Sequence, residues 1–169
     1  MALGNGFKTN TTTAPKKSPW GGVKSALPQT PQLNFGHEYE LELLGYEETR
    51  NPSKGTESYK VKVKVVDSDD DKIKAGTESL IIFMKHGKAL EAAMSKLKAV
   101  SVAFAGMRSD EEYDEADPEG NFISNTFLGT GENLIGEHAH CKCLQGSPIN
   151  DKPGEYWREF IWSPVAKEG

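Results

Sequence analysis

The sequence predicts a mainly β fold with five strands and one α-helix, in the order β-β-β-α-β-β. Two observations carry this prediction. Five short segments show the alternation or the apolar run that is typical of strands. Residues 88–104, which lie between the third and the fourth of these segments, instead repeat apolar side chains at helical spacing.

The first two strand segments, residues 37–43 and 58–66, alternate between apolar and polar residues. They read HEYELEL and SYKVKVKVV. Successive side chains of a strand point to opposite faces, so each segment is expected to bury one face and expose the other. Residues 51–55 between them contain Asn, Pro and Gly and are typical of a hairpin loop.

The remaining elements have different patterns. Residues 79–84 form a nearly continuous apolar run, which predicts a third strand buried on both faces. The fourth and fifth strands are expected at residues 137–144 and 156–162. The helix over residues 88–104 is expected to end at Gly106 and to bury one stripe, which consists of Leu90, Ala93, Met94, Leu97 and Phe104.

A single helix between the third and the fourth of five strands is the order of elements in an OB fold. This fold is a five-stranded, partly open Greek-key barrel that binds oligonucleotides or oligosaccharides through strands two and three and two flanking loops. We expect an OB-fold-like domain at residues 36–165, followed by a short tail at residues 166–169. Because one fold hosts many functions, the function must be inferred from particular residues.

Residues 1–35 differ from the rest of the chain. Asn, Thr, Pro, Gly and Lys dominate, and such a composition predicts a disordered arm. The arm contains four lysines and no acidic residue, so it carries +4; the whole chain carries −5, which leaves −9 for the remainder. A basic arm can reach for phosphate or for an acidic partner, and a solubilising tail is the alternative interpretation.

Acidic residues gather in two predicted loops, at residues 67–71 between strands two and three and at residues 110–119 after the helix. Negative loops repel a polyanion, so in a nucleic-acid-binding protein they are expected to point away from the bound strand. Solvated loops that keep the protein soluble are the simpler interpretation.

The segment with His138, His140, Cys141 and Cys143 has the residue types of a zinc site, but its spacing argues against one. On a single strand the two histidines face one side and the two cysteines face the other. Four ligands on opposite faces do not converge on one tetrahedral ion. We therefore expect buried, reduced cysteines and no metal.

Catalytic and cofactor motifs give little support to an enzyme. Asp67, Asp69, Asp71 and Glu78 have the spacing of a calcium loop, but Lys72 stands where that loop requires glycine. The sequence has no Gly-x-Ser-x-Gly, no phosphate-binding loop and no His-Glu-x-x-His. We expect neither catalysis nor a cofactor.

Cations and aromatic residues instead predict a binding surface for single-stranded nucleic acid. The side chains of Lys60, Lys62 and Lys64 share one face of the second strand, where they could follow a phosphate backbone. Aromatic rings on neighbouring strands could stack on bases whatever the sequence. The candidate nucleic-acid-binding residues are Arg50, Lys54, Lys60, Lys62, Lys64, Phe83, Lys85, Tyr156, Trp157 and Arg158.

An internally paired surface is the competing interpretation. The side chains of Glu38, Glu40 and Glu42 alternate along the first strand and could lie opposite the lysines of the second. Several aromatic residues are also needed to fill the core of a domain of this size.

Several short stretches resemble those of bacteriophage single-stranded-DNA-binding proteins with an OB fold. The stretches are GHEY at residues 36–39, SYKVKV at 58–63, AGTES at 75–79, NLIG at 133–136 and YWR at 156–158. The resemblance implies sequence-independent binding of single-stranded DNA during phage replication or recombination. Many such proteins end in an acidic tail that recruits replication partners, whereas this sequence ends in Ala-Lys-Glu-Gly. The resemblance thus implies replication or recombination proteins as partners, and the acidic loop 110–119 is where they are expected to bind.

We therefore expect a protein that protects and organises single-stranded DNA without catalysis. A structural or adaptor β-barrel that binds protein partners, such as a phage virion component, is the alternative. No apolar run approaches the roughly 20 residues that cross a membrane, so we expect a cytoplasmic protein with no membrane partner, in the host cytoplasm if a phage encodes it.

Overall fold

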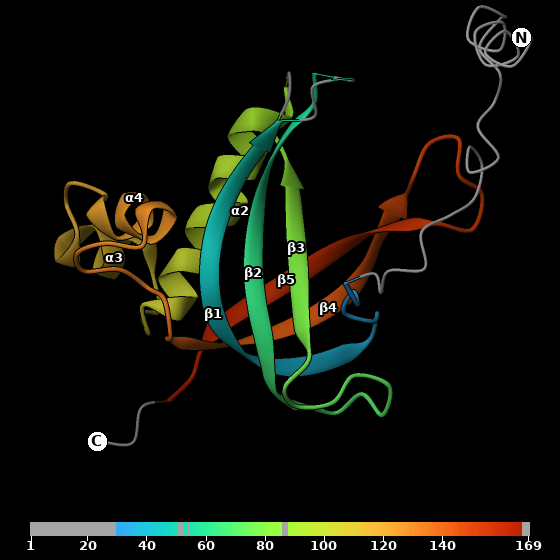
Figure 1. The fold of residues 1–169 in the computed structure, drawn as a ribbon, viewed down its shortest axis with the longest axis horizontal. Helices are drawn as coiled ribbons and strands as arrows, with labels where there is room; N and C mark the ends of the chain where they lie inside the picture. The colour runs from blue at the N-terminus through green and yellow to red at the C-terminus, as the bar shows by residue number, and fades with distance from the viewer. Residues whose placement is uncertain (1–29, 51–52, 54, 86–87, 167–169) are drawn as a thin grey trace, which may run out of the picture.

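The computed structural model describes residues 30–50, 53, 55–85 and 88–166, and within these residues the protein is mainly β (Figure 1). Five strands form one sheet: β1 (His37–Arg50), β2 (Glu57–Ser68), β3 (Glu78–Met84), β4 (His138–Pro148) and β5 (Tyr156–Pro164). Three helices follow β3 in the chain: α2 (Ala89–Phe104), α3 (Asp110–Ala116) and α4 (Asn121–Leu128). Residues 1–29 of the predicted arm lie outside the described residues.

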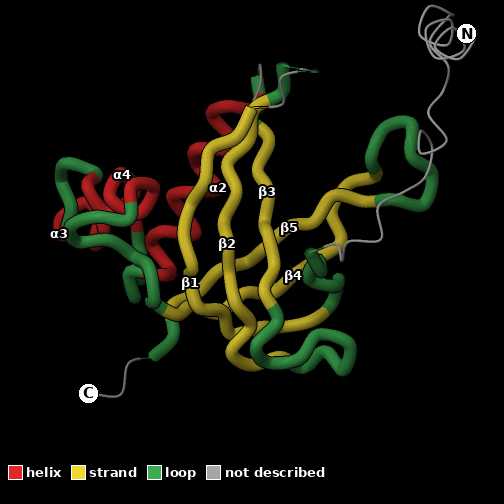
Figure 2. Tube along the Cα trace, in the orientation of Figure 1, coloured by secondary structure: helices red, strands yellow, loops and turns green. Residues whose placement is uncertain are grey.

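The sheet is antiparallel and open, with the strand order β3-β2-β1-β4-β5. Figure 2 shows β1, β2 and β3 side by side in front, with β4 and β5 crossing behind them. No ladder joins the edge strands β3 and β5 within the described part of the chain. The mainly β prediction is therefore confirmed, and the sheet has two unpaired edges.

Strand β1 is longer than predicted, and it curves so that it belongs both to the front part of the sheet, with β2 and β3, and to the rear part, with β4 and β5 (Figure 1). Its first six residues, 37–42, pair with β4, and residues 39–50 pair with β2 except at Leu44, which the register skips. The register with β2 shifts between Glu40 and Leu41 and again between Leu43 and Gly45. Such bulges bend a strand and increase its twist. The sequence prediction ended this strand at Leu43 because the alternation breaks there, but the break is a bulge.

The alternation in β2 gives the predicted burial. Val61, Val63 and Val65 are at most 1% exposed and lie in the core, while the lysines between them face outwards. The prediction that β3 is buried on both faces is wrong. Ile81 is buried but Ile82 is 45% exposed, because β3 is an edge strand whose outer face nothing covers among the described residues.

Helix α2 buries a stripe that begins later than predicted. Its core-facing line runs through Ala93, Leu97, Val100 and Phe104, and the residues 101–103 near its end are also buried. Met94 lies about 100° around the helix from Ala93, on the flank of this line, and is 56% exposed. Leu90 is on the same side as Leu97, seven residues earlier, but it lies in the first turn and is 42% exposed.

The acidic segment predicted as a loop forms α3 and leads into α4. The side chain of Ser109 accepts a hydrogen bond from the backbone N–H of Glu112 and caps α3. The acidic residues of the first turn of α3 are favourable there because a helix carries partial positive charge at its N-terminus. The carboxylate of Asp117 accepts hydrogen bonds from the backbone N–H groups of Asn121 and Phe122 at the start of α4. The acidic residues are thus part of a folded helical unit.

None of the helices in the described ranges is long and apolar enough to cross a membrane.

Residues 31–35 were predicted as the end of the arm, but together with Gly36 they fill the space between the two sheet edges. Leu33 is 1% exposed and belongs to the core. Ser79 of β3 donates a hydrogen bond to the carbonyl oxygen of Pro31 over 2.6 Å. Arg158 of β5 donates from Nε to the carbonyl oxygen of Leu33 over 2.7 Å. This segment therefore connects β3 to β5 where they do not pair with each other.

The carboxylate of Asp70 holds this segment in place. Its Oδ2 atom accepts hydrogen bonds from Asn34 Nδ2 at 2.7 Å and from the Tyr39 hydroxyl at 2.9 Å, and its Oδ1 atom accepts one from the backbone N–H of Lys72 at 2.9 Å. The bond from Lys72 above all, and then those from Asn34 and Tyr39, hold the pKa of Asp70 below its ordinary value. Burial opposes this effect, since the residue is only 5% exposed. One side chain thus joins the β2–β3 turn, β1 and the N-terminal segment.

The two cysteines lie on the inner face of β4, as the alternation predicted. Cys141 and Cys143 are buried free thiols, whereas His140 is exposed on the outer face. Burial raises the pKa of both thiols, that of Cys143 to about 11. Both side chains are therefore protonated core residues at neutral pH.

Replacing Asp70 with Asn should lower the melting temperature at neutral pH and reduce the acid sensitivity of the fold. The pKa of Asp70 in the folded protein is below its ordinary value of 3.8. Its contribution to stability is therefore complete above that pH and is lost as the pH falls through the folded-state pKa. Thermal unfolding measured across the acid range tests this, with Asp71→Asn, at an exposed neighbour, as the matched control. Identical acid limbs in both variants and the wild-type protein would contradict this role.

Candidate nucleic-acid interface

The outer face of β2 and β3 carries a row of lysines beside a row of apolar side chains. Lys60 and Lys62 lie opposite Ile82 and Leu80 in the register, and Met84 continues the apolar row on β3. Side chains of residues paired across two strands project to the same face. The predicted lysine row therefore exists, and the apolar residues next to it belong to the alternation of β3 that the sequence interpretation missed.

Two of the three lysines are paired with carboxylates. Lys62 Nζ lies 3.1 Å from Glu47 Oε2, and Lys64 Nζ lies 3.7 Å from Glu42 Oε1. All four side chains are between 27% and 50% exposed, so these pairs contribute little to stability. Lys60 has no carboxylate within ion-pair distance in the described ranges. The row is partly neutralised, and Lys60 is the member that no described carboxylate pairs with.

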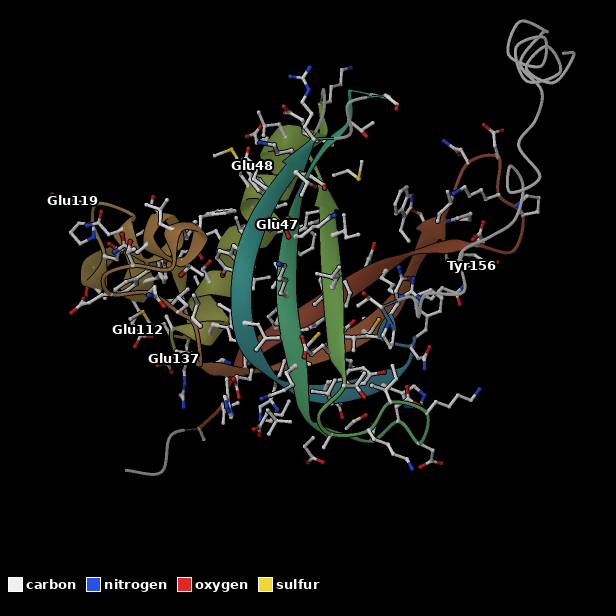
Figure 3. The ribbon with its side chains drawn as sticks, viewed as in Figure 1. Glu47, Glu48, Glu112, Glu119, Glu137 and Tyr156 are labelled. Atoms are coloured by element: carbon white, nitrogen blue, oxygen red, sulfur yellow. The ribbon has the colours of Figure 1, made fainter. Side chains whose placement is uncertain are left out.

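The internally paired surface predicted from Glu38, Glu40 and Glu42 forms only in part. Glu42 does contact a lysine, but Glu40 contacts His138, with 3.1 Å between Oε2 and Nδ1. The bulge in β1 changes the register, so Glu47 takes the place opposite the lysine row (Figure 3).

Lys85 and the predicted loop cations are placed differently. The ammonium group of Lys85 contacts the carboxylates of Glu48 and Glu57 and lies 4.7 Å from the ring centroid of Tyr59. Its side chain is only 10% exposed, so it holds the ends of β1, β2 and β3 together. Arg50 is exposed at the end of β1, and Lys54 lies outside the described residues.

Phe83 points inwards and is 7% exposed, so its ring is not on the outer face where the sequence placed it. Instead it forms one wall of a pocket of about 220 Å³ between β3, α2 and β5. The pocket is lined by Phe83, Lys96, Ala99, Arg158, Glu159, Phe160 and Trp162. Phe83 and Arg158 from the predicted set therefore meet here, together with Lys96, Phe160 and Trp162, which that set omitted.

The three predicted residues at the start of β5 divide between its faces. Trp157 is 50% exposed on the outer face, where Ile161 is also exposed. Arg158 faces inwards, and its guanidinium lies 5.0 Å from the ring centroid of Phe35. Tyr156 is half-buried where β5 leaves the β4–β5 hairpin (Figure 3). Trp157 is thus the predicted aromatic residue with the most accessible ring.

The outer face of β1 and β4 is unsuited to a polyanion. A groove of about 540 Å³ lies over this part of the sheet. Its lining includes the carboxylates of Glu38, Glu40, Asp67 and Asp69. Lys142 and His140 also line this groove, but its four carboxylates outnumber them, so the lysine row of β2 and the pocket beyond β3 are the better candidates for a polyanion.

Only some of the residues that line the pocket could have been predicted from the sequence. Residues 156–162 alternate, so Arg158, Phe160 and Trp162 necessarily share one face of β5. Nothing in the sequence indicated that Lys96 of α2 would join them, because that contact depends on how the helix packs.

The sequence matches no model of a known protein family and has no match among curated proteins. The assignment of function therefore rests on these residues.

Proposed function

We propose that this protein binds single-stranded DNA without sequence preference and without catalysis, through an OB-type barrel. The sheet order supports the barrel, because β1 pairs with both β2 and β4, and β3 and β5 are left as the edges of a partly open structure. The position of α2, α3 and α4 between β3 and β4 in the chain is compatible with it.

The observation that carries the proposal is the pair of rows on β2 and β3. An OB fold meets its ligand on strands two and three. Here that face combines Lys60, Lys62 and Lys64 with the apolar side chains of Leu80, Ile82 and Met84. Cations that follow the phosphates and aromatic rings on which bases stack are the chemistry of sequence-tolerant single-strand binding. The β2–β3 face supplies the cations, with aliphatic rather than aromatic surface beside them. The exposed ring of Trp157 adds a stacking surface on the β4–β5 hairpin.

The biological role we propose is protection and organisation of single-stranded DNA during phage replication or recombination, in the host cytoplasm. The exposed carboxylates of α3, at residues 110–116, form the surface that we propose for replication or recombination proteins. Figure 3 shows Glu112 and Glu119 on the opposite side of the molecule from Tyr156, so such a partner would not obstruct the strand.

A structural or adaptor protein is the second candidate function. Exposed apolar side chains on the helices favour it: Leu128 is 72% exposed, and Met94 and Leu90 are 56% and 42% exposed. Such residues are typical of protein contacts when they form a continuous patch. The cationic row has no part in this alternative, so DNA titrations separate the two.

Oligo-dT should bind at least about tenfold more tightly than a blunt duplex of the same length. Stacking requires exposed base faces, which a duplex hides, and contributes about 1–3 kcal/mol per base, where about 1.4 kcal/mol is tenfold. Intrinsic tryptophan quenching at several salt concentrations measures both affinities. Equal affinities would exclude stacking, and the absence of binding to either would favour the adaptor function.

Changing Lys60, Lys62 and Lys64 together to Ala should weaken oligo-dT binding at low salt and flatten its salt dependence. The slope of log affinity against log salt for single strands is about −0.7 per neutralised phosphate, so the loss is up to about two units. All sequences should be affected alike, because phosphate contacts carry no base information. A variant with Lys72, Lys74 and Lys142 changed to Ala removes the same charge from other exposed positions and is the control. An unchanged slope in the first variant would contradict the lysine track.

Glu42→Gln and Glu47→Gln should each strengthen binding at low salt. Each substitution frees a lysine from its ion pair and removes a negative charge from the path. Exposed ion pairs contribute about 0.2–1 kcal/mol, so the expected gain in affinity is up to about fivefold. Glu111→Gln on α3 is the control for the change in net charge. A gain equal to that of the control would show that the strand does not cross this face.

A further inference from the structure

The pocket between β3, α2 and β5 has the chemistry of a nucleobase site. We propose that it takes one unstacked base of the bound strand, an inference that rests on the proposed single-strand binding. The pocket opens where the two sheet edges do not meet, beyond the outer face that carries the lysines. It is thus separate from the lysine row.

Aromatic rings form the walls of the pocket, and their neighbours hold them in place. The ring centroids of Phe160 and Trp162 are 6.0 Å apart with a tilt of 34°. Trp162 also packs against the buried ring of Phe104 on α2, with 5.7 Å between centroids. Phe83 supplies a third ring from β3. Rings fixed by packing lose little freedom when a base binds, so stacking on them is efficient.

The polar groups around the rings match a nucleotide better than a purely apolar ligand. The guanidinium of Arg158 is oriented by the hydrogen bond from Nε to Leu33 and by the ring of Phe35. Its terminal N–H groups donate to no other residue in the described ranges, so they are available to a carbonyl or phosphate oxygen. Lys96 is exposed on α2 at the same pocket and offers a second cation to a phosphate.

The size of the pocket limits what it holds. Pockets for drug-sized ligands measure about 300–1,000 Å³, and this one is about 220 Å³. It therefore fits a single ring system, such as one base, and not a whole nucleotide chain or a larger cofactor.

The pocket also lies on a continuous path with the proposed interface. The lysine row is on β2, the exposed side chain of Ile82 is on the outer face of β3, and Phe83, the next residue, faces into the pocket across the free edge of that strand. A single strand that crosses β2 and β3 meets this edge next. One base turned inwards there reaches the rings, while the phosphates remain on the surface.

Filling the pocket tests the proposal. Ala99 is exposed on α2 and lines the pocket, so Ala99→Trp should lower the affinity for oligo-dT about tenfold, the equivalent of losing one stacked base. The salt slope should not change, because the lysine row is intact. Ala92→Trp is the matched control: it adds the same ring on the same side of α2, about two turns earlier, at an exposed residue that does not line the pocket. Wild-type affinity in Ala99→Trp would overturn the pocket site and leave the lysine track standing.

A second measurement does not depend on that variant folding. The chain has three tryptophans, so Trp20→Phe combined with Trp157→Phe leaves only Trp162. Oligo-dT should quench its emission, and an abasic strand of the same length should not, although both bind the lysines. Equal quenching by the two strands, or none by oligo-dT at saturation, would overturn the base site. If the wild-type protein binds neither strand, the proposed function fails and the site with it.

Discussion

The two unpaired sheet edges are the constraint on which the rest of this structure depends. A free strand edge exposes a row of backbone N–H and C=O groups and invites pairing with another chain. Here residues 31–36 cover part of the gap between β3 and β5 through the hydrogen bonds of Ser79 and Arg158 to backbone carbonyls. Helix α2 covers another part, where Phe104 packs against Trp162. The burial of Leu33 and the hydrogen bonds of Asp70 belong to the same arrangement.

The two bulges between β1 and β2, at Val66 of β2 and at Leu44 of β1, have an electrostatic effect as well as a geometric one. They allow the strand to pair with β4 first and to continue along β2 afterwards. They also decide which carboxylates meet the lysines. Glu40 is directed to His138, while Glu47 contacts Lys62, and Lys60 keeps its charge uncompensated by any described residue. The distribution of charge on the outer face thus follows from two register shifts in the backbone.

Much of the fold was predictable because strand residues that alternate in polarity also alternate between the buried and the exposed face of the sheet. The residues of β2 and the cysteines of β4 face as the pattern required, since both strands have one buried and one solvated side. The failures have local causes. Residues 110–116 of α3 were predicted as a loop because they are strongly acidic, and the N-terminal cap that Ser109 provides was overlooked. Leu33 looked like part of a tail because one apolar residue among polar ones gives no periodic signal. In the candidate interface the lysine row was predicted, whereas the inward side chain of Phe83 and the enclosed ammonium of Lys85 depend on tertiary packing.

The anchoring of residues 31–36 also bears on how the fold forms. The hydrogen bond from Arg158 to Leu33 joins residues that are 125 positions apart in the chain, and the one from Asn34 to Asp70 joins residues 36 apart. In terms of contact order, the gap between the sheet edges is closed by contacts that require long loops to close first, and such contacts belong to the slow part of folding.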